Sequence, residues 1–288
     1  MTPIASPYKQ LTDSATIVPV RINKFVALCT DLSRRTADGV VASGRITING
    51  LTATAGSQVK PIDTICLDGV KLTPRMQHTT IMLNKPVGYV CSRKGQGSKT
   101  IFELLPEAYQ HLQPVGRLDK DSSGLLILTD NGDLANDLTH PSHGKVKIYE
   151  VTLDKPLQPL HQQMISDIGI TLEDGVSQFS ITKIEIRYKK YEIRKEDVPR
   201  SGNQEIRQQP GSSPTLTPYS LLLNSCMYEV RMTEGRNRQI RRTFAALGYT
   251  VTRLHRTQLG SYHLDSLASG TTALVSLPNS LLRNSNTK

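Results

Sequence analysis

The sequence predicts an α+β fold, with two domains of unequal size and a largely antiparallel sheet in the larger one. Short β-rich runs and helical stretches interleave along most of the chain without a regular βαβ repeat, and this pattern favours antiparallel pairing. The 288 residues, of which 37% are hydrophobic, are enough to fill two separate cores. A stretch without periodicity, residues 73–78, is expected to link the domains.

The smaller domain is expected at residues 20–73. Asn23 is expected to cap a first short helix and Ser33 a second one, because short polar side chains accept hydrogen bonds from the free N–H groups of a first turn. Gly44 fits the end of the second helix. A strand follows and ends at Asn49-Gly50, the strongest short signal for a hairpin turn. The expected order is therefore two helices and then a β-hairpin.

The larger domain is expected at residues 79–278. Its predicted strands include residues 80–83, 125–129, 149–153 and 227–232. Residues 186–220 form an insertion whose charged first half and Gln-, Pro- and Ser-rich second half rarely pack into a core. This insertion is expected to be either a solvated extension or an arm that contacts RNA. Residues 1–19 and 279–288 are expected to be tails.

The charge and the cysteines limit the class of protein. The net charge of +10 favours a polyanionic partner, and nucleic acid is the commonest one. No two of the four cysteines form a C-x-x-C pair, which argues against a disulfide framework or a zinc ribbon and suits a reducing, cytoplasmic compartment. No apolar run approaches the roughly 18 residues of a membrane span, so no membrane association is expected.

Asp119 and Asp121 lie in a polar segment with a glycine at each end, directly before an apolar strand. A loop that enters a core strand can hold a reactive group rigidly. An isolated Asp in a loop is more often a turn former, so a catalytic role requires partners from elsewhere in the chain. One candidate is the strand that carries Tyr149, and another is a helix expected to start at Asn237.

Two segments could be mistaken for metal sites. The run 129–133 lacks the ligands that would follow in a calcium loop, and Asp133 fits the cap of a helix instead. His140 and His143 are separated by Pro141-Ser142 and lack a third ligand. No metal site is therefore predicted.

The small domain carries a set of basic residues that could contact RNA. Two of them, Arg34 and Arg35, lie in the first turn of a helix, where the helix dipole favours acids. The runs 21–25, 33–35 and 44–50, in this order, resemble the αL RNA-binding domain found in ribosomal protein S-four and in many RNA enzymes. The resemblance implies that these side chains contact RNA phosphates: Arg21, Lys24, Arg34, Arg35 and Arg45. One departure is Ile62 before Asp63, where the family usually has glycine.

The larger domain resembles the pseudouridine synthases of the RsuA, RluB, RluE and RluF branch. The segments that match, in the family's order and spacing, are 82–89, 116–132, the strand around Tyr149, 234–242 and 253–256. The resemblance implies the pseudouridine synthase fold, with a mixed, mostly antiparallel sheet flanked by helices. It also implies isomerisation of uridine to pseudouridine in ribosomal RNA, without a metal or another cofactor.

The resemblance also implies roles for particular residues. Asp119 corresponds to the nucleophile, and Arg241 to the basic residue that pairs with it. Tyr149 would stack on the target base, and Leu254 would pack on the base's other side. The further substrate-binding residues implied are Arg117, Arg238 and Lys85.

Several alternatives remain open on the sequence. The motifs look more like members acting on large-subunit RNA, and the alternative is small-subunit RNA; the substrate is either naked RNA or an assembly intermediate. A monomer is expected. A second hypothesis is a catalytically silent ribosome-assembly factor on the same fold. A third is a glycosidic hydrolase with Asp119 and Asp121 as paired carboxylates, but their spacing in the sequence argues against two groups facing each other across a bond.

Overall fold

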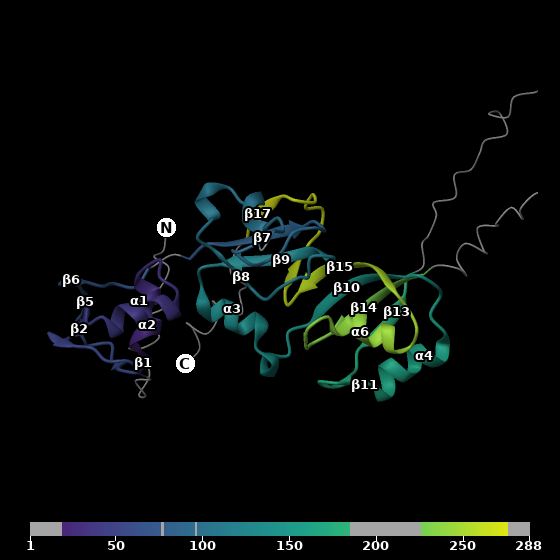
Figure 1. Ribbon diagram of the computed structural model, residues 1–288, viewed down its shortest axis with the longest axis horizontal. Coiled ribbons are helices and arrows are strands. Elements are labelled where there is room, and N and C mark those ends of the chain that lie inside the picture. The colour runs from purple at the N-terminus through teal and green to yellow at the C-terminus, as the bar shows by residue number, and fades with distance from the viewer. Residues whose placement is uncertain (1–18, 76–77, 96, 185–225, 276–288) are drawn as a thin grey trace, which may run out of the picture.

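The computed structural model describes residues 19–75, 78–95, 97–184 and 226–275 (Figure 1). The predicted insertion 186–220 lies outside these ranges. So do the predicted tails, apart from Pro19. None of the helices in the described ranges is both long enough and apolar enough to cross a membrane.

The N-terminal part consists of two packed helices beside a small antiparallel sheet, at one end of the molecule (Figure 1). Its core contains Phe25 and Val26 from the first helix, Ala37 and Val41 from the second, and Ile46 from the sheet. The sheet has the order β3-β2-β5-β6, and β1 pairs with β4. The elements are β1 (Val20–Arg21), α1 (Ile22–Cys29), α2 (Arg34–Ala42), β2 (Ile46–Ile48), β3 (Leu51–Thr52), β4 (Gln58–Val59), β5 (Ile65–Leu67) and β6 (Val70–Lys71).

Of the helix-cap and turn residues predicted in this part, three are confirmed and one is wrong. Ser33 caps α2, and its hydroxyl accepts a hydrogen bond from Thr36 N. Gly44 follows the helix with φ +73°, and Asn49-Gly50 forms the turn between β2 and β3. Asn23 does not cap α1, because the helix begins one residue earlier, at Ile22. Its amide donates to Asp38 on α2 instead.

The C-terminal part is built on a nine-stranded sheet with the path β13-β14-β10-β15-β9-β7-β17. Every pairing is antiparallel except the one between β15 and β9. The predicted α+β class with a largely antiparallel sheet is confirmed. The sheet's strands are β7 (Thr80–Lys85), β8 (Gln113–Pro114), β9 (Ser123–Thr129), β10 (Lys147–Leu153), β13 (Ser180–Lys183), β14 (Met227–Met232), β15 (Val251–Leu259), β16 (Tyr262–His263) and β17 (Thr272–Leu274).

Short helices and one hairpin flank this sheet (Figure 1). They are η2 (Ile101–Leu104), η3 (Glu107–Tyr109), α3 (Gly132–Thr139), η4 (Pro141–His143), α4 (Pro159–Gln163), the π-helix η5 (Met164–Ile168), the hairpin β11 (Ile170–Leu172) and β12 (Gly175–Ser177), and α6 (Gln239–Ala246). The caps of two helices differ from the prediction. Asn131 caps α3 in place of Asp133, and Arg238 precedes α6 with φ +45° in place of an Asn237 cap.

Strand β9 is buried on both faces, which makes it a rigid base for the loop before it. Leu126 and Leu128 face the larger core, while Leu125 and Ile127 face a second core formed with α3. At its start β9 pairs with β15 through Gly124. A Cβ atom at Gly124 would collide with the backbone of Arg256, so glycine is required for the two strands to approach. The junction therefore holds segments from distant parts of the chain close together.

An ion pair connects the two parts of the chain. Lys24 Nζ on α1 lies 2.6 Å from Asp133 Oδ1 on α3. The Arg75 N–H donates to the Leu28 carbonyl oxygen at 3.2 Å, which ties the linker to the end of α1. The N-terminal helices thus lie beside the face of the C-terminal part that α3 covers.

Candidate active site

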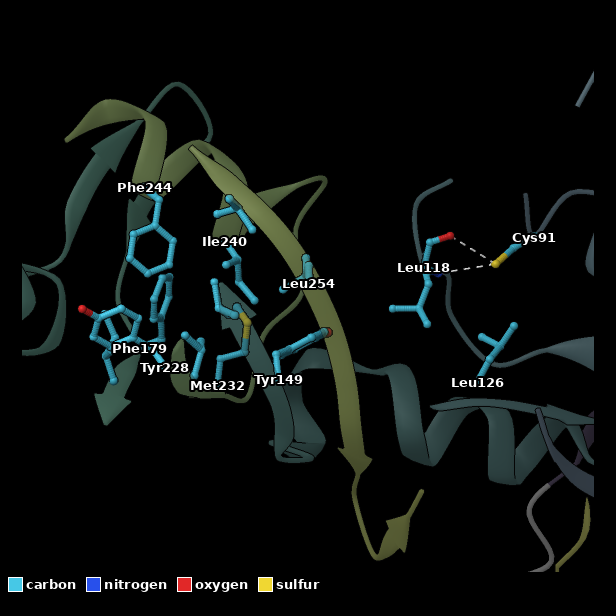
Figure 2. Close-up of a cluster of buried hydrophobic side chains, with 14 of the residues drawn as sticks. Cys91, Leu118, Leu126, Tyr149, Phe179, Tyr228, Met232, Ile240, Phe244 and Leu254 are labelled. Atoms are coloured by element: carbon cyan, nitrogen blue, oxygen red, sulfur yellow. Dashed lines mark hydrogen bonds between the residues drawn. The ribbon is translucent and has the colours of Figure 1, made fainter. Parts of the chain in front are cut away.

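Hydrogen bonds from two buried side chains hold the backbone of the loop that carries Asp119. Lys85 Nζ donates to the carbonyl oxygens of Asp119 at 2.9 Å, Ser122 at 2.7 Å and Pro86 at 3.1 Å. Cys91 Sγ donates to the Leu118 carbonyl oxygen and accepts from the Leu118 N–H, as Figure 2 shows. These bonds fix the backbone on both sides of Asp119 and leave its side chain 34% exposed.

Lys85 was expected to bind substrate, and the structure corrects this. The residue ends the buried strand β7, is completely buried, and does not line the cavity described below. Burial lowers the pKa of Lys85, and the carboxylates of Asp119 and Asp121 oppose the shift. Because its ammonium group is directed at backbone carbonyls of the loop, Lys85 supports the loop instead of contacting substrate.

The turn that leads into α6 brings two arginines to this loop. Arg238 Nη1 lies 3.7 Å from Asp119 Oδ2, and the same guanidinium binds both carboxylate oxygens of Asp121, at 3.0 and 2.9 Å. Arg241 donates to the carbonyl oxygens of Asp121 and Val251, at 2.8 and 2.7 Å, and its Nε lies 3.3 Å from Asp121 Oδ2. The expected ion pair between Arg241 and Asp119 is therefore not present, since Arg241 pairs with Asp121.

Asp121 connects both arginines to the loop, a role that the sequence analysis did not assign. Burial opposes ionisation of its carboxyl group, but the Arg238 hydrogen bond and the charges of Arg241 and Arg238 outweigh it and hold the pKa of Asp121 below its ordinary value. A carboxylate held in this way by arginine is not free to act as an acid or a base. The geometry thus argues against a hydrolase that uses Asp119 and Asp121 as a pair.

Asp119 lies at the edge of a cavity of about 530 Å³. Its lining includes the loop that contains Arg117 and Asp119, and the segment 233–238. Tyr149 and Leu254 line the floor, on neighbouring strands β10 and β15, and are 8% and 7% exposed. Figure 2 shows these two side chains next to each other, with Met232 beside them. The remaining lining residues are Val115, Gly116, Leu118, Ser122, Leu138, Thr139, Pro141, Lys147, Met232, Gln239, Ile240, Arg256 and Leu259.

The arrangement unites most of the predicted substrate-site residues. Asp119, Arg117, Tyr149, Leu254 and Arg238 all line this one cavity. Arg241 and Lys85 do not line the cavity, but each donates to a backbone carbonyl oxygen of the loop. The volume and the mixture of apolar floor and charged walls suit a single polar ring with a charged backbone attached.

A second set of ion pairs fixes the segment 233–238 that lines the cavity. Asp174, at the tip of the β11–β12 hairpin, accepts hydrogen bonds from Arg236 at 3.1 Å and from Arg242 at 3.0 and 2.6 Å. Arg236 also donates to the Val176 carbonyl oxygen at 2.7 Å. Two arginines of the 234–242 run therefore bind the protein itself, which the sequence pattern alone did not distinguish from RNA contacts.

The five basic residues predicted to bind RNA differ in whether they form ion pairs with the protein itself. Arg34 and Arg35 are exposed at the start of α2 and form no ion pair with any described residue, and Arg21 is exposed before α1. Arg45 binds Asp68 through two of its nitrogens, and Lys24 pairs with Asp133. Three of the five guanidinium and ammonium groups are thus unpaired within the described ranges.

Comparison with known proteins gives consistent relatives. Residues 79–246 match the family model described as RNA pseudouridylate synthase. The dual-specificity RNA pseudouridine synthase RluF of Escherichia coli is 31% identical over 253 residues, which cover 87% of this chain and 73% of that protein. The ribosomal small subunit pseudouridine synthase A of Pasteurella multocida is 34% identical over 255 residues, which cover 87% of this chain and 94% of that protein. A crystal structure of a pseudouridylate synthase aligns with a TM-score of 0.55 at 27% identity, covering 92% of this chain and 98% of that one.

Proposed function

The chain belongs to the RsuA and RluF branch of the RNA pseudouridylate synthase family and is an RNA pseudouridine synthase, and from this we propose that it isomerises a uridine of ribosomal RNA with Asp119 as its nucleophile. One observation carries the assignment of the nucleophile. Among the described residues, Asp119 combines a backbone fixed by buried donors with a carboxylate that is open to the cavity.

The reaction breaks the bond between N1 of uracil and C1′, turns the base, and joins C1′ to C5. It is redox-neutral, so positioned side chains are sufficient in principle. The Asp119 carboxylate reacts with the substrate in its ionised form, and Arg238 places positive charge 3.7 Å away. Arg241 acts indirectly. It donates to the Asp121 carbonyl oxygen and so holds the loop that carries Asp119.

Tyr149 and Leu254 form the surface on which the base lies. A uridine inside an RNA helix must leave its stack to enter the cavity beside Asp119, which costs a few kcal/mol. An aromatic ring and an apolar side chain in the floor replace part of that lost stacking. Exposed cations at the mouth of the cavity, Arg117 above all, are suited to the phosphates on either side of the target.

We propose large-subunit ribosomal RNA as the substrate, with small-subunit RNA as the alternative. The support for the large subunit is the likeness of the runs 116–122 and 234–239 to the RluB, RluE and RluF members. Relatives named for RluF and for the small subunit are both similar to this chain, at 31% and 34% identity. We also infer that the protein works as a monomer in the cytoplasm.

Tritium release tests the substrate directly. The C5 hydrogen must leave when C5 becomes the glycosidic carbon, so RNA labelled there releases tritium only when it is converted. We expect release from large-subunit transcripts or from their assembly intermediates, and none from small-subunit RNA. The reverse result would select the small subunit. Absence of release from every transcript and every assembly intermediate would favour a catalytically silent assembly factor.

The N-terminal part is proposed to bind RNA phosphates through Arg34 and Arg35. Replacing both with glutamine should lower the slope of log affinity against log salt by up to ~1.8, since each phosphate contact contributes about 0.9 for a double helix. Arg45→Gln is the matched comparison, and its effect should be smaller because Asp68 already neutralises that side chain. An unchanged slope in the double variant would show that α2 does not touch the RNA.

A further inference from the structure

A buried arginine in the floor of the cavity has no role in the mechanism described so far. Arg256 on β15 lines the cavity and is 3% exposed. Its Nε donates to the Leu125 carbonyl oxygen at 2.8 Å, while its Nη2 is buried without a hydrogen-bond partner. It forms no ion pair with any carboxylate of the described residues. Because arginine stays charged in proteins, this is a buried cation with unused donor capacity.

A second cation lies close to it. Lys147 lines the same cavity, and its Nζ donates to the Thr233 carbonyl oxygen at 2.8 Å. Burial lowers the pKa of Lys147, the charge of Arg256 lowers it further, and Glu234 acts in the opposite direction. The two cations therefore repel each other across the floor. A ligand that carries negative charge would relieve this repulsion.

The sheet register places both cations next to the proposed base-stacking residue. Arg256 is the direct partner of Tyr149 in the β10–β15 pairing, and Lys147 lies two residues before Tyr149 on the same face of β10. Arg256 also follows Leu254 by two residues, so it shares the face of β15 that lines the cavity. The polar edge of a base that lies on Tyr149 and Leu254 would thus meet Arg256.

The depth of Arg256 distinguishes it from cations suited to phosphate. Arg117 is exposed and the Arg238 side chain is 44% exposed, so both can reach the RNA backbone at the mouth. A nucleotide that swings out of a helix enters such a cavity base first, and its phosphates remain outside. The part of the substrate that reaches a residue in the floor is the uracil ring, whose O2 and O4 accept hydrogen bonds.

We propose that Arg256, with Lys147 beside it, donates to a carbonyl oxygen of the target uracil and stabilises the negative charge that develops on the ring. This inference rests on the proposed reaction of Asp119 in the same cavity. When the bond between C1′ and N1 breaks, its electron pair stays on the uracil and spreads over N1, O2 and O4. The ring then forms the new bond to C1′ through C5, the C5 proton leaves, and N1 takes up a proton, so that uridine and pseudouridine have the same composition. Addition of Asp119 to the ring would also place charge on O4, so the role does not depend on the route.

Arg256→Met tests the proposal, with Arg256→Lys and Arg253→Met for comparison. Arg253 lies on the same strand, is 48% exposed, and pairs with Glu150 outside the cavity. We expect Arg256→Met to lower the rate of tritium release at saturating RNA by ~10²-fold or more, as loss of a donor to a developing oxyanion does. RNA affinity should change by less than about threefold, because exposed phosphate contacts remain. Arg256→Lys should recover part of the rate, and Arg253→Met should behave as wild type.

Two outcomes would overturn the proposal. A loss of RNA affinity with an unchanged rate at saturation would make Arg256 a phosphate contact. An unchanged rate and affinity would leave it no part in the reaction. In either case, tritium release by the wild-type protein would leave the proposed function intact. Failure of the wild type on every ribosomal RNA and assembly intermediate would instead remove the proposed function itself.

A second measurement separates charge stabilisation from a merely structural effect. Fluorine at C5 stabilises a negative uracil ring, so RNA with 5-fluorouridine at the target position depends less on a protein donor. We expect the deficit of Arg256→Met to shrink at least several-fold on this RNA, measured as disappearance of 5-fluorouridine in a nucleoside digest. A variant that is slow because the floor is distorted would be equally impaired on both substrates, and this result would also contradict the proposal.

Discussion

Asp119→Asn is expected to abolish tritium release from ribosomal RNA while leaving RNA affinity nearly unchanged. The amide has almost the size of the carboxylate but cannot act as the nucleophile. Loss of the nucleophile lowers rates by roughly 10⁴-fold or more in well-studied enzymes that react through one, such as serine proteases. The bonds that hold the loop involve the Asp119 carbonyl oxygen, which the substitution retains. The expected result is therefore a folded protein that binds but does not turn over.

Asp167→Asn is the matched control for this experiment. Asp167 is exposed on the π-helix η5, away from the cavity lining, and its variant should keep full activity. If Asp119→Asn also lost most of its RNA affinity or its cooperative unfolding, Asp119 would be a structural residue of the loop. Substantial tritium release by Asp119→Asn would assign the chemistry to another group.

Local signals in the sequence were sufficient for the position of Asp119 and for much of the N-terminal part. A polar segment between glycines and directly before an apolar run predicts a loop that enters a buried strand, and β9 is that strand. Ser33 and Asn49-Gly50 act through hydrogen bonds and turn geometry within a few residues, so tertiary structure does not override them. Asn23, by contrast, does not cap α1, because the helix begins at Ile22 and Asn23 lies inside it; its amide nitrogen donates to Asp38 on the neighbouring helix.

The contacts between distant segments were less predictable. Arg241 was expected to pair with Asp119 but pairs with Asp121, two residues further along the same loop. A sequence motif brings the loop and α6 together without determining which carboxylate meets which guanidinium. Arg256 was assigned no role, although the run 253–256 was recognised as a motif. Because this run lies in strand β15, Arg256 shares a face with Leu254, two residues before it.

The role of Lys85 follows from its burial, which the sequence does not show. A role in substrate binding was expected from the resemblance of residues 82–89 to a family motif, which carries no information on burial. In the structure both faces of β7 are covered, so Lys85 is directed inward and its ammonium group meets three backbone carbonyls. Its position below Asp119 makes it a positioning residue for the loop.

Lys85→Met should therefore reduce both stability and activity. Methionine fills a similar volume but removes the only donor that the described residues offer to the carbonyl oxygens of Pro86 and Ser122, and it leaves Asp119 O with the Ser122 N–H alone. Each buried polar group left unsatisfied costs about 1–3 kcal/mol, so a loss of about 2–6 kcal/mol in the free energy of unfolding is expected from urea titrations. The same change frees the loop backbone, and misplacement of a reacting group by about 1 Å can lower a rate by roughly 10²-fold.

Activity measured well below the melting temperature separates the two effects. At a temperature where Lys85→Met is fully folded by circular dichroism, tritium release at saturating RNA should still be strongly reduced. Lys99→Met, which removes an exposed ammonium group from the same part of the chain, should change neither quantity. A Lys85→Met protein that is less stable but fully active when folded would show that the bonds to the loop stabilise the fold without positioning Asp119. The position of Asp119 would then depend on the bonds from Cys91 and from the arginines on the other side of the loop.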